Sequence, residues 1–366
     1  MDRITYGFVG LGLIGGSMAR AIKAADPACR IIAYTPHRKT VDAAFSDGII
    51  DEPLYEIGPA FKECDYIFLC APVEINNSNL ELLLPFIDKK TTLTDIGSVK
   101  NSIHAKVKEL GLERQFIGGH PMTGTERIGY KNSKAALLEN AYYILTKTEN
   151  TDESRLERYR ELVKDMGALP LIVPYMQHDY ITAAISHVPH VISASLVNLV
   201  KDNDSDEGLM KTIAAGGFKD ITRISSSSPT MWQQICNNNS DNISELLSKY
   251  IDSLYDIKLA IDEHDNEKLF DFFSSAREYR ESFNDIASGP IQKTFVIHVE
   301  IDDQPGRLAK VAVLLSENSI NIKNIGIVHN REYERGTLRI ELHSKKGLEK
   351  ALQVLSDNGY TVSERN

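Results

Sequence analysis

The feature that most limits how this chain can fold is a glycine pattern directly after its first apolar run. Residues 4–9 read as a buried strand, and the residues after the pattern read as a helix. In Gly-x-Gly-x-x-Gly, the glycines permit a tight turn, close approach of a pyrophosphate, and close helix–strand packing. The alternative is a glycine-rich turn with only a structural role. We predict a dinucleotide site whose first contacts are Gly10, Gly12, Leu13, Ile14 and Gly15.

The end of the second expected strand lacks the acidic residue that usually binds the ribose 2′-hydroxyl of NAD. Thr35 occupies this place, and Pro36, His37, Arg38 and Lys39 follow it. No carboxylate is present there to repel a 2′-phosphate, and cations are close enough to receive one. We therefore expect NAD or NADP as the cofactor, with Thr35 and Arg38 among its contacts. A solvated turn whose charges bind nothing is the alternative.

Short apolar runs alternate with helical stretches over residues 1–174. Most of the runs are continuous and rich in β-branched or aromatic residues, as strands buried on both faces are. The alternation predicts an α/β domain with a doubly wound, mostly parallel sheet of the Rossmann type. One run ends in Cys70, Ala71 and Pro72, which we expect to line the cofactor crevice. The expected strands are ITYGFVG, RIIAYT, YIFLCAP, TTLTDIG, QFIGGH, AYYILT and LPLIVP.

Two further domains are expected after this one. Residues 175–289 carry almost no strand signal and have apolar spacing near 3.6, which predicts an all-α domain. A helical block that follows a dinucleotide domain usually covers the substrate and forms a dimer, and we expect this role here. Residues 290–366 follow the turn signal Ser288-Gly289-Pro290 and predict the order βαββαβ, a compact ferredoxin-like module.

Charge and composition exclude several classes of function. The net charge of −10 makes a broad nucleic-acid surface unfavourable, since phosphate binding needs a surplus of Lys and Arg. No continuous apolar run approaches the roughly 18 residues that span a bilayer, and we expect no signal peptide, because the strand-like run begins within a few residues of Met1. The cysteines Cys29, Cys64, Cys70 and Cys236 are scattered without a CxxC pair, which indicates the reducing cytoplasm.

Two loops at expected strand ends carry polar residues suited to chemistry. Asp95–Lys100 reads DIGSVK, and residues 118–126 read GGHPMTGTE. Carboxyl ends of parallel strands are where open α/β sheets bind ligands. The imidazole of His120 titrates near neutrality and suits proton transfer. A structural hydrogen bond is the alternative role for this histidine.

The helical segment holds a second group of candidates. His187 and His190 are three residues apart with His178 nearby, so a metal is conceivable, but no cysteine or carboxylate completes a recognisable ligand spacing, and we predict none. Pro189 indicates a distorted helix there. Arg223 is either an exposed helix charge or part of a loop entering a helix, which Ser228 would cap with a proline behind it.

In this order, the motifs GLGLIGGS, DIGSVK, GGHPMTGTE, SHVPH and GFKDITRI resemble the prephenate dehydrogenase family. The terminal IDDQPGRLAKV and NIKNI resemble an ACT domain, and the two resemblances together cover essentially the whole chain. They imply oxidative decarboxylation of prephenate to 4-hydroxyphenylpyruvate, with hydride transfer from the ring carbinol carbon to a nicotinamide, in a homodimer.

The resemblance also implies roles for individual residues. His120 matches the histidine that draws the proton from the substrate hydroxyl, and Ser98 matches the serine that orients that histidine and the nicotinamide. Arg223 matches the arginine that grips a substrate carboxylate, a role for which bidentate guanidinium is well suited. Glu126 matches an acidic residue near the pocket entrance, and Asp220 matches an acidic residue beside the arginine. Ser186 and His190 match polar residues near the pyruvyl side chain. Trp232 matches an aromatic residue that closes the pocket from the partner subunit; the alternative is that it is simply buried.

In the terminal module, exposed N–H groups between strand and helix are expected to bind the end product tyrosine, and a plain dimerisation module is the alternative. The expected contacts are Asp302, Gln304, Pro305, Gly306, Asn321 and Ile322. Two other functions stay open for the whole chain. An arogenate dehydrogenase would need an acidic contact for the substrate amine, and His190 at that end favours prephenate instead. A catalytically silent regulator is disfavoured by the presence of Ser98, His120 and Arg223.

Overall fold

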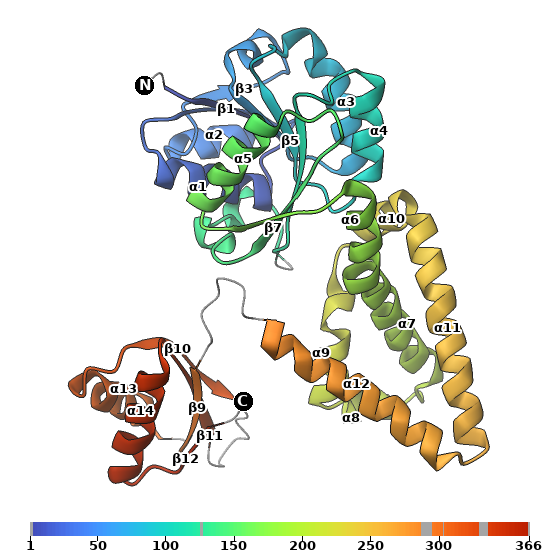
Figure 1. Ribbon diagram of the computed structural model, residues 1–366, viewed down its shortest axis with the longest axis vertical. Coiled ribbons are helices and arrows are strands. Elements are labelled where there is room, and N and C mark those ends of the chain that lie inside the picture. The colour runs from blue at the N-terminus through green and yellow to red at the C-terminus, as the bar shows by residue number, and fades with distance from the viewer. Residues whose placement is uncertain (1–2, 125–126, 287–294, 303, 329–335, 365–366) are drawn as a thin grey trace. The chain divides into compact units, whose positions relative to one another are not determined.

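The computed structural model describes residues 3–124, 127–286, 295–302, 304–328 and 336–364 (Figure 1). The chain forms two compact units, Met1–Tyr255 and Asp256–Asn366. The first unit holds a large sheet and most of the helical segment, and the second holds the last long helix and a small sheet.

The first unit is built on a sheet whose strand order is β3-β2-β1-β4-β5-β6-β7-β8. All neighbours are parallel except β6 and β7, which agrees with the predicted mostly parallel sheet. All seven predicted strands are present. The eighth, β3, was missed because its three residues, one of them Pro53, carry little apolar signal at a sheet edge. The strands are β1 (Thr5–Val9), β2 (Arg30–Tyr34), β3 (Glu52–Leu54), β4 (Tyr66–Leu69), β5 (Thr92–Asp95), β6 (Phe116–Pro121), β7 (Tyr142–Thr146) and β8 (Leu169–Ile172).

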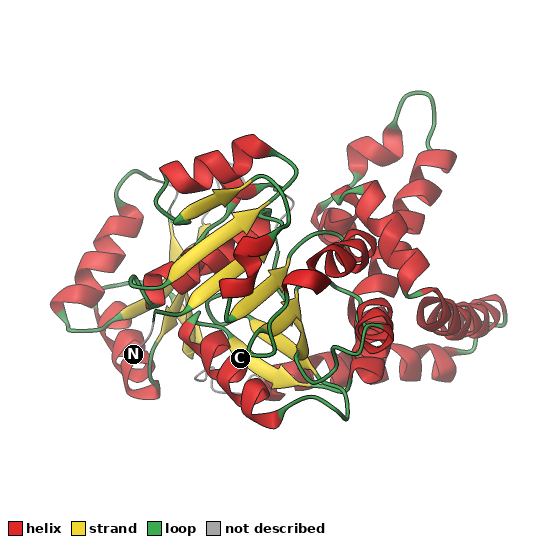
Figure 2. Cartoon of the chain, turned by 90° about the horizontal axis from the view of Figure 1, so that it is seen from above, coloured by secondary structure: helices red, strands yellow, loops and turns green. Residues whose placement is uncertain are grey.

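Helices cover both faces of this sheet (Figures 1 and 2). One buried cluster joins the sheet to α1, α2 and α5 and includes the stacked rings of Phe8 and Phe68, whose centroids are 4.8 Å apart. A second cluster joins the opposite face to α3 and α4 through Leu80, Ile103 and Val107. The predicted doubly wound architecture is therefore confirmed. The helices are α1 (Leu13–Ala25), α2 (Arg38–Ser46), α3 (Val73–Leu83), α4 (Asn101–Glu109) and α5 (Glu153–Asp165).

The helical segment begins with one long, distorted helix. Helix α6 (Tyr175–Thr182) continues through a π turn at Ala183–His187 into α7 (Val188–Asn203). Pro189 has no N–H to donate to the carbonyl four residues earlier, so the regular α ladder is interrupted at this point. The distortion predicted from this proline is present.

The rest of the segment is helical, as predicted. Helices α8 (Leu209–Ile213) and α9 (Gly216–Thr222) lead into a 3₁₀ turn at Arg223–Ser226, followed by α10 (Pro229–Asn238) and α11 (Ser240–Asp262). Ser228 caps α10 by accepting from the N–H of Met231 at 3.4 Å, with proline at the first helical position. The predicted cap is therefore confirmed.

The stretch Tyr175–Asn203 is also long and apolar enough, by length and composition alone, to cross a bilayer. Counting uninterrupted apolar residues missed it, because polar residues such as His178 and Asp179 interrupt the run. Those two side chains are fully buried against the sheet domain, whereas Ile185 and Leu199 are exposed. The first turns of this helix are thus held by buried polar contacts, and apolar side chains further along it are exposed.

The second unit contains α12 (Asn266–Ile286) and the predicted βαββαβ module. Its antiparallel sheet has the order β10-β11-β9-β12. Alternate residues of β11 are buried, and helices α13 and α14 pack on that face through Val311, Leu315, Leu348 and Leu355. The elements are β9 (Phe295–Ile301), α13 (Arg307–Glu317), β10 (Ile322–Val328), β11 (Gly336–Leu342), α14 (Lys345–Asp357) and β12 (Val362–Glu364).

Gly118 and Gly119, directly before His120, allow the packing at the end of β6 to be tested by substitution. A Cβ at Gly118 would lie 2.2 Å from Oγ1 of Thr146, so Gly118→Ala should lower the free energy of unfolding by about 2 kcal/mol. The matched strand variant Gly326→Ala meets no atom within 4 Å and should change it by less than about 0.5 kcal/mol. Urea denaturation followed by circular dichroism measures both, and equal losses would contradict the packing argument.

Candidate active site

The glycine-rich turn has the shape of a phosphate cradle. Gly10 has φ of +99°, and a Cβ there would lie 2.8 Å from the backbone carbon of Cys70, so the turn needs glycine. A Cβ at Gly12 would meet nothing within 4 Å, which leaves open space directly in front of the α1 N-terminus. No side chain caps α1 and no acidic residue stands in its first turn. The free N–H groups and the positive end of the helix dipole fit a dinucleotide pyrophosphate.

The loop after β4 closes one side of this cradle. The buried Asn76 holds it, donating to the carbonyls of Leu69 and Ala71 and accepting from the N–H of Ala71 at 3.0 Å. Sγ of Cys70 would lie 3.2 Å from a Cβ at Gly15, so the predicted contacts of both loops face each other. Burial raises the pKa of the Cys70 thiol, which therefore lies beside the glycine-rich turn as an uncharged group.

The expected ribose end of the site lies at the carboxyl end of β2. Thr35 is buried there, and no acidic residue follows it before α2. Arg38 begins α2 as an exposed residue, with its guanidinium 4.9 Å from the ring centroid of Tyr55. Tyr55 in turn donates to Asp42 at 2.9 Å. The cation predicted to accept a 2′-phosphate is thus held on an aromatic ring beside the expected position.

A buried ion pair joins the ends of β5 and β6. Lys100 and Asp95 are both fully buried and contact each other directly. The ammonium group of Lys100 also donates to the carbonyl of Gly119 at 2.7 Å, next to the predicted catalytic His120. Ser98 lies half-buried two residues before the lysine. The lysine therefore fixes the Ser98 loop and the histidine strand relative to each other.

His120 belongs to a hydrogen-bonded chain of three side chains. Its Nδ1 lies 2.8 Å from Nε2 of His178, and Nδ1 of His178 lies 2.7 Å from Oδ1 of Asp179. Burial lowers the pKa of His120 well below its usual value, and the positive charge of the neighbouring Lys100 lowers it further. His120 is therefore a neutral imidazole at physiological pH, as a proton acceptor must be.

A row of further side chains extends from His120 along α7. His187, whose pKa burial lowers to about 4, accepts at Nδ1 from Asn239 at 3.1 Å and is close enough to influence His120. His190 stacks on Trp232 with ring centroids 3.7 Å apart. Burial lowers the pKa of His190, and so does the positive charge of Arg223 nearby. The positive charge of Arg223 therefore lies at the end of a row of neutral histidines.

The segment that carries Arg223 is attached to α7. The hydroxyl of Ser193 holds this segment on both sides of Arg223. It donates to the carbonyl of Ile221 at 3.1 Å and forms a hydrogen bond with the hydroxyl of Ser225 at 2.6 Å. Arg223 itself is exposed, as is Asp220 on α9, and Ser186 lies half-buried in the π turn. The guanidinium is thus held at the open end of the histidine row.

The structure brings together most of the predicted site residues. His190, Arg223 and Trp232 form one group, with Trp232 reaching His190 within its own chain. His187 lies between this group and His120: its ring centroid is 6.0 Å from that of Trp232, and it influences His120 electrostatically. Glu126 lies outside the described residues. Within the described parts of the chain, no group of three or more His, Cys, Asp or Glu side chains is arranged to hold a metal ion.

Several residues that shape the site were not given a role from the sequence. The motif DIGSVK contains Lys100 without indicating its role, and the spacing of the histidines suggests His178 only as a conceivable metal ligand. Asp179 and Ser193 were not identified at all. A lysine five residues after a strand-end aspartate was the available signal for the ion pair. The contacts of Asp179, by contrast, join positions 78 and 79 residues apart in the chain.

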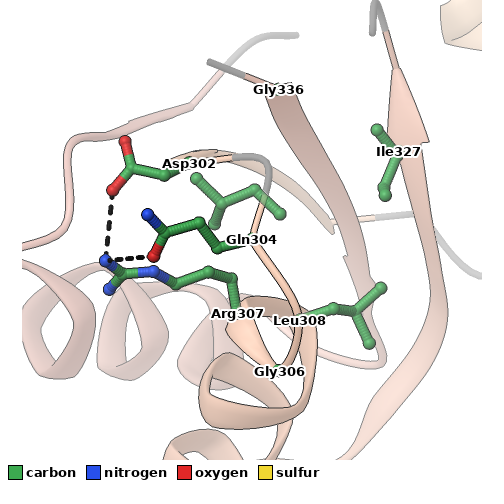
Figure 3. Close-up of a pocket in the computed structure, with 8 residues that line it drawn as sticks. Asp302, Gln304, Gly306, Arg307, Leu308, Ile327 and Gly336 are labelled. Carbon is green, nitrogen blue, oxygen red and sulfur yellow. Dashed lines mark hydrogen bonds and ion pairs between the residues drawn. The ribbon is translucent and has the colours of Figure 1, made fainter. Parts of the chain in front are cut away.

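The small module has a pocket of its own, of about 380 Å³ including its open mouth (Figure 3). Arg307 points across it, 3.2 Å from a carboxylate oxygen of Asp302 and 3.4 Å from Oε1 of Gln304. Of the predicted regulatory residues, Asp302, Gln304 and Gly306 line this pocket; Pro305, Asn321 and Ile322 are not among its lining residues. The other lining residues are Ile301, Leu308, Ile327 and Gly336.

The buried histidines predict how stability depends on pH. Burial lowers the pKa of His104 to about 3 and that of His187 to about 4, whereas unfolded histidine titrates near 6.5. The unfolded chain therefore binds more protons between these values, so the free energy of unfolding falls as pH falls from about 6.5. Each such histidine contributes up to about 1.4 kcal/mol per pH unit.

His104→Gln should therefore make this slope shallower by about 1 kcal/mol per pH unit between pH 5 and 6. Urea denaturation at several pH values measures the slope. The matched variant His37→Gln, at an exposed position, should keep the wild-type slope, and an unchanged slope in His104→Gln would contradict the assignment.

With this geometry established, comparison with known proteins gives a consistent result. The family described as prephenate dehydrogenase, nucleotide-binding domain, matches residues 18–171, and prephenate dehydrogenase, dimerization domain, matches residues 175–275. A prephenate dehydrogenase of Bacillus subtilis is 36% identical over 348 residues, 94% of each chain. That alignment is long enough to include most of the small C-terminal module.

Solved structures agree with the sequence relatives. The prephenate dehydrogenase of Aquifex aeolicus, in complex with hydroxyphenyl propionate and NAD⁺, has a TM-score of 0.73 and 29% identity, covering 77% of this chain and 99% of that one. The arogenate dehydrogenase of Synechocystis has a TM-score of 0.69 and 27% identity, covering 76% and 100%. From its sequence, its folded domains and its site, this chain belongs to the prephenate dehydrogenase family of NAD-dependent oxidoreductases.

Proposed function

We propose that this chain oxidises and decarboxylates prephenate to 4-hydroxyphenylpyruvate with NAD or NADP, in tyrosine biosynthesis. The observation that carries the proposal is the neutral imidazole of His120 at the end of β6, in a row of polar side chains that ends at Arg223. A proton acceptor at one end and a cation at the other suit a substrate with a hydroxyl at one end of its ring and carboxylates beyond it.

The cradle residues Gly10, Gly12 and Gly15 would hold the pyrophosphate, with Cys70 to Pro72 lining the crevice beside it. When bound, the nicotinamide accepts a hydride from the ring carbinol carbon. Ser98, half-buried on the loop that Lys100 fixes, is placed to orient the ring and His120 together. The residues of the chain thus align the carbinol carbon, which donates the hydride, with the nicotinamide, which accepts it.

His120 acts on the substrate hydroxyl. As a neutral base it takes the hydroxyl proton while the carbinol C–H bond gives up its hydride. The bond to the ring carboxylate then breaks, releasing CO₂, and its electron pair makes the ring aromatic and moves onto the oxygen. His120 returns the proton to that oxygen, giving the phenol. No net proton is released, so the enzyme needs no further acid or base.

Arg223 binds a substrate carboxylate against an unfavourable overall charge of −10. A charge-assisted, bidentate contact supplies affinity and orientation at once. His190, stacked on Trp232, and Ser186 offer hydrogen bonds to the pyruvyl side chain, and Asp220 shapes the segment around the arginine. An arogenate dehydrogenase would need an acidic group for the substrate amine. The stacked, neutral His190 favours a keto group at this end, so arogenate is the second candidate.

The roles of His120 and Arg223 can be separated kinetically. His120→Asn should lower kcat roughly 10²- to 10⁴-fold with little change in KM, because it removes the base and leaves binding intact. Arg223→Ala should chiefly raise the KM for prephenate, by about 10- to 100-fold, the effect of losing a charged hydrogen bond.

The measurement is formation of reduced cofactor from prephenate or arogenate, with NAD and with NADP. Lys201→Ala, an exposed cation on α7, is the matched control and should behave as wild type. The reverse kinetic pattern would mean that the two roles are misassigned. Absence of turnover by the wild-type chain with every substrate and cofactor would favour a regulatory protein instead.

We also propose a cytoplasmic homodimer in which the helical segment forms the interface. Large apolar side chains are exposed on several of its helices, including Ile185, Leu199, Ile213 and Ile221. Large apolar side chains left exposed on a helical segment suit an interface with a second copy. We further propose that the chain has three domains: a dinucleotide domain at 1–174, a dimerisation domain at 175–289 and a regulatory domain at 290–366. The last boundary lies outside the described residues.

The C-terminal module is proposed to be an ACT domain that binds tyrosine and inhibits the enzyme. Its βαββαβ order and antiparallel sheet support this assignment. Its pocket offers a guanidinium and a carboxylate, Arg307 and Asp302, for the two charges of an amino acid, with apolar Leu308 and Ile327 nearby (Figure 3).

Arg307→Met should therefore weaken tyrosine inhibition at least tenfold while leaving the uninhibited kcat unchanged, because it removes the carboxylate's partner. Inhibition of prephenate turnover is measured across a tyrosine titration. Lys310→Met, one turn further along α13 and outside the pocket, should leave inhibition intact. Wild-type turnover that tyrosine does not affect would refute the regulatory role while leaving the catalytic proposal untouched.

A further inference from the structure

We propose that His178 and Asp179 are positioning residues that fix the proton of His120 on Nδ1 and keep its Nε2 free to accept the substrate proton. The inference rests on the proposed function of His120 and adds two residues to it. Both lie on α6, both are completely buried, and neither has a role assigned by the motifs of the sequence.

Asp179 fixes the direction of the first hydrogen bond. Its Oδ1 accepts from the N–H of Lys100 at 2.8 Å, and its Oδ2 accepts from the N–H of Asn101 at 2.8 Å. A carboxylate in this setting has only acceptors to offer. Nδ1 of His178, 2.7 Å from Oδ1, must therefore carry a proton and donate it.

The state of His178 fixes the second hydrogen bond. Burial lowers the pKa of His178 even though Asp179 opposes this effect, so the ring is neutral and has only one N–H. With that N–H at Nδ1, Nε2 is an acceptor. Nδ1 of His120, 2.8 Å away, is then the donor. Because His120 is also neutral, its Nε2 carries the free lone pair that proton transfer requires.

The same carboxylate also positions the Ser98 loop. Its two backbone partners, at positions 100 and 101, begin α4 directly after that loop. A negative charge at this helix N-terminus is favourable. The carbonyl of Asp179 accepts from Nδ2 of Asn239 at 2.7 Å, which holds α6 in place from the other side. One buried anion therefore sets both the tautomer of His120 and the backbone that carries Ser98.

When His120 takes up a proton, the ring becomes an imidazolium in a buried site. The Nδ1–H bond to His178, backed by the negative charge of Asp179, stabilises that cation, as an aspartate does for the histidine of a serine protease. A purely structural polar pair would be replaceable without loss of rate. A positioning pair would not, and the two roles therefore differ in kcat.

The tautomer can be observed directly in the full-length wild-type enzyme. Long-range ¹H–¹⁵N spectra of histidine-labelled protein distinguish a protonated nitrogen from a bare one, and the His120→Asn spectrum assigns the signals. At neutral pH we expect His120 to be protonated at Nδ1 and bare at Nε2. Protonation at Nε2 would overturn the proposal, and the tautomer itself is observed in the wild-type protein.

His178→Phe keeps a ring in place but removes both nitrogens. We expect kcat to fall roughly 10²-fold, the lower end of what a histidine base contributes, while the KM values for prephenate and cofactor stay within threefold. In this variant the His120 signals should shift toward protonation at Nε2. The matched control is His104→Phe, another fully buried histidine, bonded to Thr146, whose kcat should stay within threefold of wild type.

The outcomes separate the two proposals. Wild-type enzyme that does not turn over prephenate refutes the proposed function, while the spectra still test the tautomer of His120. Active wild-type enzyme with Nε2–H on His120, or folded His178→Phe with unchanged kcat, refutes the positioning role alone.

Discussion

The site depends on the buried ion pair between Lys100 and Asp95. Neither side chain contacts solvent, so each charge is tolerated only because the other is present. Removing one partner of such a pair typically costs about 3–5 kcal/mol, because the remaining charge is left unpaired. The lysine also donates to the carbonyl of Gly119, and its N–H donates to Asp179. Lys100 therefore joins strands β5 and β6 of the sheet to helix α6 of the next segment.

Around this ion pair, the protein separates two electrostatic environments. The histidines on the sheet side are buried and neutral, which makes them proton acceptors and hydrogen-bonding groups. The positive charge proposed to bind an anionic substrate lies at the open end, on Arg223, whose side chain is exposed to solvent. A globally acidic surface is compatible with an anionic substrate because attraction acts at short range inside a crevice, whereas the overall field is screened within about 10 Å.

Features that depend on neighbouring residues were predictable from the sequence. The strands, the glycine turn and the Ser228 cap follow from local sterics and hydrogen bonding, and all are present. His120, His190 and Arg223 were predicted as site residues from short motifs, and Trp232 from the family resemblance. What could not be predicted depends on contacts between distant segments. The bonds of Asp179 to the start of α4 span 78 and 79 residues, and β3 exists because a neighbouring strand pairs with it rather than through its own pattern.

The π turn between α6 and α7 inserts one additional residue into a helix that would otherwise keep a single phase. It divides the helix into two halves: His178 and Asp179 on the first are hydrogen-bonded in a chain with His120, and His190 and Ser193 on the second contact Trp232 and the segment that carries Arg223. Under the roles proposed above, the second half can change to suit another substrate side chain while the contacts of His120 stay intact. A family that includes both prephenate and arogenate dehydrogenases on one scaffold is the natural outcome of such a division.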